Sequence, residues 1–334
     1  MNAPLSSQVI VTAPARLHLG FVDLNPPTGR RFGSLGLALS APCCRVRGFH
    51  GTLAQRDISV AQAKALQHVA ALRCAYAFSP EISVEVIESI PAHCGLGSGT
   101  QLGMAVGTTI SRIAGLNLSA ADIRQQLARG ARSGIGIGAF AQGGFLVDGG
   151  HGATTNLPPI TSRVMFPEHW RVLLIFDEAF QGLSGAKEAA AFCNLPSFPE
   201  TLSAHLCRLV MTRILPGLAE ANMAEFGPAI TEVQRLVGDH FAPAQGGRFA
   251  STAVANALAW LEARGAQCVG QSSWGPTGFA MLESAQQAQQ FAQEAAAKYP
   301  ALRLVVASGR NEPADIQLEY ADRAGATILP LARR

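Results

Sequence analysis

The sequence has 334 residues, of which 48% are apolar and 15% are charged. This length suits two domains of ordinary size, and this composition excludes a disordered chain. The formal net charge of +3 is too small to indicate a nucleic-acid partner. No apolar run approaches the ~20 residues that span a bilayer, and the first residues lack the pattern of a secretory signal. We therefore expect a cytoplasmic protein that binds neither nucleic acid nor a membrane.

The seven cysteines include no CxxC pair, and their number is odd. Neither a zinc site nor a disulfide framework is therefore expected. Cys94 lies beside a glycine-rich loop and is a candidate nucleophile, although a small buried thiol is the more common occupant of such a position.

The predicted elements mix strands and helices without a regular alternation. β-branched or alternating apolar residues predict the strands, and apolar spacing of three to four residues predicts the helices. In chain order we predict a strand over 9–13, a polar turn over 23–31, a helix over 62–77, a strand over 82–87, a helix that ends near 113, a helix over 119–130, a strand over 145–148, a strand over 170–176, helices over 201–221, 228–237 and 249–264, strands over 266–271 and 278–282, a helix over 285–298 and a strand over 302–307. This irregular order favours the α+β class.

A Pro158-Pro159 pair and the polar stretch after it mark the best candidate for a domain boundary. We therefore predict one domain over 1–160 and a second over 161–334. The sequence leaves the oligomeric state open, and a homodimer is one option.

The glycine-rich stretch CGLGSGT at 94–100 lies between a predicted strand and a predicted helix. The N-terminus of a helix offers unpaired N–H groups and a partial positive charge, and glycines let phosphate oxygens approach the backbone. The stretch is not a Walker A loop, because no GK[ST] follows, and its GxGxG spacing is a poor dinucleotide-binding pattern. A phosphate site and a tight turn that only packs a helix on a strand therefore both remain open.

Five arginines lie in residues 1–50 beside a single acid, Asp23. Guanidinium groups bind phosphate and carboxylate through paired hydrogen bonds, so this excess suits an anionic ligand. A solvated strand face rich in arginine is the equally good alternative.

Three stretches in chain order resemble the sequence motifs of the GHMP kinases: PARLHLG at 14–20, PAHCGLGSGT at 91–100 and QSSWGPTG at 271–278. The resemblance covers most of the chain and implies a two-domain α+β fold whose glycine-rich loop binds phosphate. Gly136 replaces the aspartate that commonly acts as the base in these kinases, and Gly99 replaces the second serine of the loop. An ATP-dependent small-molecule kinase is kept as the alternative function, and a non-catalytic metabolite sensor as a third.

The chain is more similar to one branch of this superfamily, the β-ribofuranosylaminobenzene 5′-phosphate synthases. The stretches that carry this resemblance are 16–23, 94–101, 132–136, 142–150, 182–186 and 271–278. It implies condensation of 4-aminobenzoate with phosphoribosyl pyrophosphate, with release of CO2 and pyrophosphate, in the biosynthesis of (tetrahydro)methanopterin. The arene would attack at its carboxylate-bearing carbon and regain aromaticity by losing CO2. No proton has to leave that carbon, so glycine at position 136 is expected for this chemistry.

Three candidate catalytic residues follow from the motifs and the arginine-rich stretch. Asp23 is expected to hold the cofactor Mg²⁺ on pyrophosphate or to stabilise the cationic ribose, with an arginine partner or a turn cap as the alternative. Arg30 is expected to clamp pyrophosphate or the benzoate carboxylate. His18 is a weaker candidate, because buried histidines are commonly structural. The expected substrate-binding residues, among which Trp274 would stack on the arene, are Arg16, Gly95, Gly97, Ser98, Gly99, Thr100, Gln101, Ser272, Ser273, Trp274 and Gly275.

Overall fold

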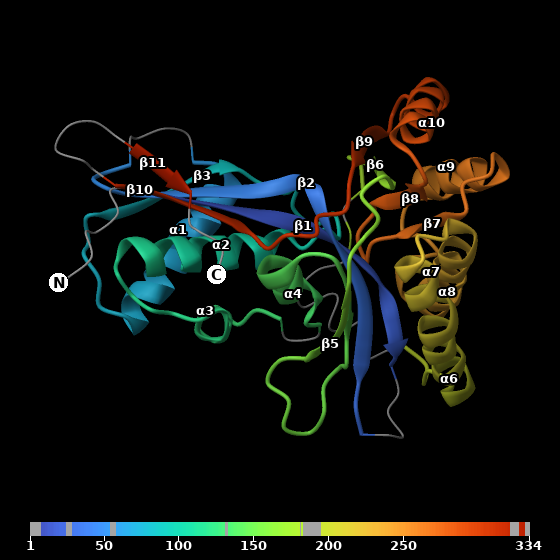
Figure 1. Cartoon of the computed structure of the whole chain (residues 1–334), viewed down its shortest axis with the longest axis horizontal. Coiled ribbons are helices and arrows are strands. Elements are labelled where there is room, and N and C mark those ends of the chain that lie inside the picture. The colour runs from blue at the N-terminus through green and yellow to red at the C-terminus, as the bar shows by residue number, and fades with distance from the viewer. Residues whose placement is uncertain are drawn as a thin grey trace.

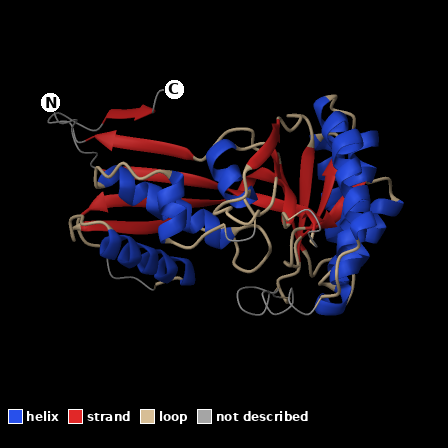
Figure 2. Ribbon diagram, turned by 90° about the horizontal axis from the view of Figure 1, so that it is seen from below, coloured by secondary structure: helices blue, strands red, loops and turns tan. Residues whose placement is uncertain are grey.

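The computed structural model describes residues 8–24, 29–53, 58–130, 133–180, 182, 195–320 and 327–330. Over these residues the chain forms two sheets, each packed against its own helices (Figures 1 and 2). This mixture of mostly antiparallel sheets and helices confirms the α+β class. In the same part of the chain, no helix combines the length and the apolar character needed to cross a membrane.

The first sheet is organised around two long antiparallel strands, β1 (Gln8–Asp23) and β2 (Phe32–His50). Its strand order over the described residues is β11-β10-β1-β2-β4-β5, and β3 pairs with the part of β2 that β4 does not cover. The remaining strands are β3 (Ile82–Glu88), β4 (Phe145–Asp148), β5 (Ile160–Val164), β10 (Asp315–Tyr320) and β11 (Thr327–Pro330).

Four helices lie on one face of this sheet (Figure 1). They are α1 (Val60–Ala75), α2 (Ser98–Ile113), α3 (Ala120–Gln126) and α4 (Ile135–Gln142). Helix α2 is central and almost fully buried, and small residues let its neighbours approach it closely. A Cβ atom at Gly107 would lie 2.2 Å from a side-chain carbon of Ile123, so the contact between α2 and α3 requires glycine there.

The second sheet has the order β7-β8-β6-β9 and comprises β6 (Arg171–Phe176), β7 (Cys268–Gln271), β8 (Gly278–Leu282) and β9 (Arg303–Ala307). Its helices are α6 (Glu200–Leu209), the π-helical turn η1 (Val210–Ile214), α7 (Leu215–Ala219), α8 (Met223–Gln245), α9 (Thr252–Ala263) and α10 (Ala285–Lys298). Alternate residues of β6 join two cores: Val172 and Leu174 pack with α8, whereas Leu173 and Ile175 pack with α9 and α10. Burial on both faces explains why β6 is a continuous apolar run.

The predicted elements from 62–77 to 302–307 are present, most of them with shifted ends, but several elements were missed. Strand β2, helix α4 and strands β5, β10 and β11 were not predicted, and β1 and α8 are longer than expected. Glycine and proline within β2 and two glycines within α4 weaken the local signals for strand and helix. Tertiary packing decides their conformation instead.

The sheets do not separate at residue 160. Strand β5 begins at Ile160 and pairs with β4, and the late strand β10 pairs with β1. The first sheet therefore takes strands from both sides of the Pro158-Pro159 pair.

Candidate functional site

The glycine-rich loop adopts a backbone conformation that only glycine takes readily. Gly95 and Gly97 have φ values of 85° and 81°, in the left-handed region. Gly97 is the N-cap residue of α2 and supplies no side-chain cap, so the first turn of the helix opens directly from the loop. This is the arrangement of strand, glycine loop and helix N-terminus that binds anions in other proteins.

The three motifs meet at this loop. From β1, the backbone N–H of Arg16 donates to the carbonyl of Leu96 at 3.1 Å, and the Arg16 guanidinium donates to the carbonyl of Gly95. From the segment after β7, the hydroxyl of Ser272 donates to the same Gly95 carbonyl at 2.8 Å and accepts from the backbone N–H of His18 at 3.0 Å. Residues more than 170 positions apart are therefore joined by direct hydrogen bonds.

Backbone packs directly on backbone where the loop meets the third motif. A Cβ atom at Gly275 would lie 2.2 Å from the carbonyl carbon of Cys94, and one at Gly95 would lie 2.1 Å from the carbonyl oxygen of Ser272. Gly182 also enters this contact, because its N–H donates to the carbonyl of His93 at 3.3 Å. Glycine at these positions is required by close approach, whatever the loop binds.

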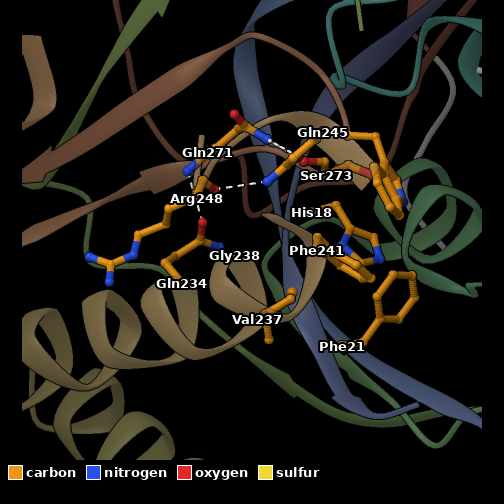
Figure 3. A pocket seen from close by; sticks show the side chains of 12 residues that line it. His18, Phe21, Gln234, Val237, Gly238, Phe241, Gln245, Arg248, Gln271 and Ser273 are labelled. Carbon is orange, nitrogen blue, oxygen red and sulfur yellow. Dashed lines mark hydrogen bonds between the residues drawn. The ribbon is translucent and has the colours of Figure 1, made fainter. Parts of the chain in front are cut away.

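A cavity with a volume of about 30 Å³ lies beside this junction, between β1, α8 and residues 271–274 (Figure 3). Its walls include four aromatic side chains, His18, Phe21, Phe241 and Trp274. The rings of Phe241 and Trp274 lie 4.4 Å apart and those of His18 and Phe21 lie 4.6 Å apart. Figure 3 shows His18, Phe21 and Phe241 together on one side of the cavity, with the glutamines on the other. The cavity thus brings together His18, Ser273 and Trp274, all three of which were candidates from the sequence.

Helix α4 begins against the first turns of α2. The side-chain amide of Gln101 donates to the carbonyl of Gly136 at 2.8 Å. A Cβ atom at Gly136 would lie 3.1 Å from the methyl group of Thr100, so Thr100 already occupies the space next to the position where the kinases commonly carry aspartate. A side chain at position 136 would therefore crowd Thr100, whereas glycine fits beside it.

Asp148 holds this start of α4 in place and was not singled out from the sequence. Its buried carboxylate accepts from the Ser133 hydroxyl and the Gly134 N–H, each at 2.9 Å, and from the Gly150 N–H at 3.0 Å. The sequence signal that could have identified Asp148 is its position directly after the apolar residues of a predicted strand and before two glycines.

Asp23 and Arg30 lie elsewhere, near the far end of the β1–β2 hairpin (Figure 1). Asp23 accepts a hydrogen bond from Ser203 of α6 at 3.0 Å. Arg30 is exposed and donates to the carbonyls of Gly149 and Gly150 at 2.7 and 2.8 Å. Asp23 lies seven positions beyond Arg16 along β1, a span of roughly 20 Å. The hydrogen bonds described above for the glycine loop come from Arg16, His18 and Ser272 instead.

Cys94 does not have the properties of an activated nucleophile. Burial raises the pKa of its thiol, and the Sγ–H donates to the carbonyl of Pro91 at 3.0 Å. A thiol rather than a thiolate is therefore present near neutral pH. Among the described residues, no group of three or more His, Cys, Asp and Glu side chains is placed to hold a metal ion.

Comparison with known proteins identifies the family. Residues 61–144 match the GHMP kinases N terminal domain, and residues 214–301 match the GHMP kinases C terminal domain. A β-ribofuranosylphenol 5′-phosphate synthase of Archaeoglobus fulgidus is 31% identical over 287 residues, which cover 81% of this chain and 87% of that protein. The corresponding protein of Methanocaldococcus jannaschii is 32% identical over 258 residues, which cover 68% and 77%.

The chain belongs to the β-ribofuranosylphenol 5′-phosphate synthase family of GHMP-fold enzymes.

Solved structures agree on the fold of this family member. A homoserine kinase from Cytophaga hutchinsonii has a TM-score of 0.62 at 16% identity, over 95% of this chain and 99% of that one. A mevalonate diphosphate decarboxylase from Staphylococcus aureus has a TM-score of 0.63 at 12% identity, over 93% and 98%. These likenesses establish the two-domain GHMP fold that the motifs predicted.

Proposed function

We propose that the protein condenses phosphoribosyl pyrophosphate with a para-substituted benzoate, 4-aminobenzoate in the first instance, and releases CO2 and pyrophosphate. The observation that carries the proposal is the glycine loop at the N-terminus of α2, to which β1 and the segment after β7 are hydrogen-bonded. This arrangement suits a phosphorylated substrate, and the phenol in the names of the relatives points to an arene as the second substrate. We place the reaction in the biosynthesis of (tetrahydro)methanopterin.

The reaction requires stabilisation of the leaving pyrophosphate and of the cationic ribose more than it requires proton transfer. Departure of pyrophosphate leaves an oxocarbenium-like ribose, and the arene attacks it through the carbon that bears the carboxylate. The C–CO2 bond then breaks, and its electron pair restores the aromatic ring. Backbone N–H groups of Gly97, Ser98 and Gly99 would bind the phosphate groups, Arg16 would fix the loop through the Gly95 carbonyl, and Trp274 would stack on the arene.

Asp23 is assigned to the stabilisation of positive charge or to a metal ion, and Arg30 to an anionic group of a substrate; both roles require a substrate that extends along β1 toward the hairpin end, away from the glycine loop. Mg²⁺ is usually held by substrate phosphates with one or two carboxylates, and a lone aspartate fits that mode better than a protein cage. Such an ion would neutralise the leaving pyrophosphate. His18 lines the cavity beside Phe21 and is assigned to contact with the acceptor.

The relatives are named for a phenol product, which bears a hydroxyl where the product of 4-aminobenzoate bears an amine. Both substituents donate electrons to the ring carbon para to them, which is the carbon that carries the carboxylate. 4-Hydroxybenzoate is therefore the second acceptor that we propose.

The test is an incubation of the protein with phosphoribosyl pyrophosphate, Mg²⁺ and each benzoate in turn, with products read by mass spectrometry. We expect a ribosyl 5′-phosphate arene together with equal amounts of pyrophosphate and CO2. A parallel incubation with ATP and small alcohols should leave ATP intact. Consumption of ATP without ribosylation would replace the proposal with the kinase alternative.

A further inference from the structure

A single arginine side chain lies along α2 and points toward the glycine loop. Arg129 follows α3, and its Cγ and Nε atoms lie 3.5 Å from the position that a Cβ of Gly103 would take. Its Nη1 atom lies 3.5 Å from the corresponding position at Gly99, one helical turn nearer the N-terminus of α2. The Arg129 side chain therefore lies along the first turns of α2, at ordinary van der Waals distance from both glycine positions.

The positive charge of Arg129 is not matched by an acid. Its hydrogen-bond partner is His68, with Nη2 and Nε2 3.3 Å apart. Burial, with help from Arg129 and Lys64, lowers the pKa of His68 to about 4, so the imidazole is neutral near pH 7. Within the described part of the chain, Arg129 forms no ion pair, and its buried Nε has no hydrogen-bond partner.

Such a placement is unfavourable for the protein alone. Burial lowers the pKa of the Arg129 guanidinium, which reflects the cost of removing a cation from water. The N-terminus of α2 also carries a partial positive charge, which repels a cation at the first turn. An anion bound at the first turn would be attracted by both the guanidinium and the helix N-terminus, so it would offset the cost of burying the cation and the repulsion between the two positive groups.

We propose that Arg129 binds a phosphate group of the substrate at the first turn of α2. This assignment rests on the proposed function, because it takes the glycine loop as the phosphate site. The planar guanidinium can donate two hydrogen bonds to one phosphate, in addition to those from the helix backbone.

The test measures anion binding without turnover. Inorganic pyrophosphate and ribose 5-phosphate are titrated separately into the wild type and into Arg129→Met, Arg129→Lys and Arg112→Met by calorimetry. Methionine keeps the apolar stem that packs on α2, and Arg112 is an exposed arginine in the last turn of the same helix. We expect Arg129→Met to weaken binding of at least one anion roughly 10–100-fold, Arg129→Lys to weaken it less, and Arg112→Met to leave it unchanged.

Thermal unfolding separates binding from a structural role. Because the cation is unfavourably placed, Arg129→Met should unfold at the same temperature as the wild type or higher without ligand, and should lose the stabilisation that the anion gives. If Arg129→Met loses the stabilisation by pyrophosphate alone, Arg129 binds the pyrophosphate leaving group. If it loses the stabilisation by ribose 5-phosphate alone, Arg129 binds the 5′-phosphate ester.

Unchanged affinity of Arg129→Met for both anions would overturn the inference, as would a wild type that binds neither. A wild type that binds the anions but forms no product would overturn the proposed function and leave the role of Arg129 in anion binding supported.

Discussion

Gly97 should be intolerant of a side chain for two separate reasons. Its φ of 81° is strained for any other residue, and a Cβ there would lie 3.2 Å from the Arg16 side chain. We expect Gly97→Val to raise the dissociation constant for phosphoribosyl pyrophosphate about tenfold or more, measured by calorimetry. Gly246→Val is the matched control, because Gly246 has a φ of 85° with no atom within 4 Å of its Cβ position. Equal effects in both variants would assign the loss to backbone strain alone.

Asp23 and Arg30 should affect different kinetic constants. If Asp23 stabilises charge that develops in the transition state, Asp23→Asn should lower kcat by ~10²–10³ with a smaller change in KM. Arg30→Ala should instead raise the KM of the substrate whose anionic group it binds. Steady-state kinetics on variants with wild-type circular dichroism would measure both. Near-wild-type constants for both variants would confine the active site to the glycine-loop end of β1.

The sequence predicted the residues around the glycine loop better than those that support them. Arg16, Gly95 and Ser272 were named from motifs, and their hydrogen bonds now show that the motifs form one junction. Arg129 and Asp148 were not singled out, because no local pattern reports their contacts with His68, 61 positions from Arg129, and with Ser133, 15 positions from Asp148. The distance between Asp23 and Arg16 could not be predicted either. The sequence predicted a short strand followed by a polar turn from Asp23, whereas β1 is a 16-residue strand that ends at Asp23.

At the scale of elements, Ser272 joins the segment after β7 to both β1 and the glycine loop. Its side chain is fully buried, and Ser272→Ala would leave the His18 N–H and the Gly95 carbonyl each without this partner. We expect the free energy of unfolding to fall by about 1–3 kcal/mol and substrate binding to weaken. Denaturant unfolding and calorimetry would measure the two effects.

Ser251→Ala provides the matched control for this variant. Ser251 is also buried and caps α9 through the N–H of Val254 at 3.1 Å, far along the chain from the glycine loop. It should lower stability by about 1 kcal/mol and leave substrate affinity unchanged. Unchanged affinity in Ser272→Ala as well would show that the junction serves the fold only.

Periodicity identified elements whose burial repeats along one face, and it failed where packing replaces the pattern. The strand at 145–148 and the helix at 285–298 were predicted with the ends that they have. The capping box of Ser119 and Asp122 is present as well, although the helix it begins ends at Gln126 rather than near 130. Helix α4 was missed because its first six residues, Ile135–Phe140, are all buried and so carry no helical repeat. The packing of this segment against α2 favours the helix, and local sequence carries no signal for such packing.

At the scale of the whole molecule, the first sheet depends on the last described strands. Residues 8–12 of β1 pair with residues 315–319 of β10. A chain that stops at residue 308 should therefore expose the edge of β1. We expect it to aggregate in gel filtration and to lose the cooperative transition in thermal unfolding. A chain that stops at residue 320 keeps β10 and should behave more like the full chain. Equal stability of the 308-residue chain and the full chain would mean that the first sheet is stable without β10.

The pairing of β1 with β10 also sets the order in which the protein can be completed during synthesis. Ribosomes add about 5–20 residues per second, so β10 emerges roughly 15–60 s after β1. During that interval the first sheet lacks its neighbour at β1, and an unpaired edge can recruit the same strand from another nascent chain. The first sheet of this enzyme is thus completed only once β10 has been made, and crowded polysomes are where its misassembly should begin.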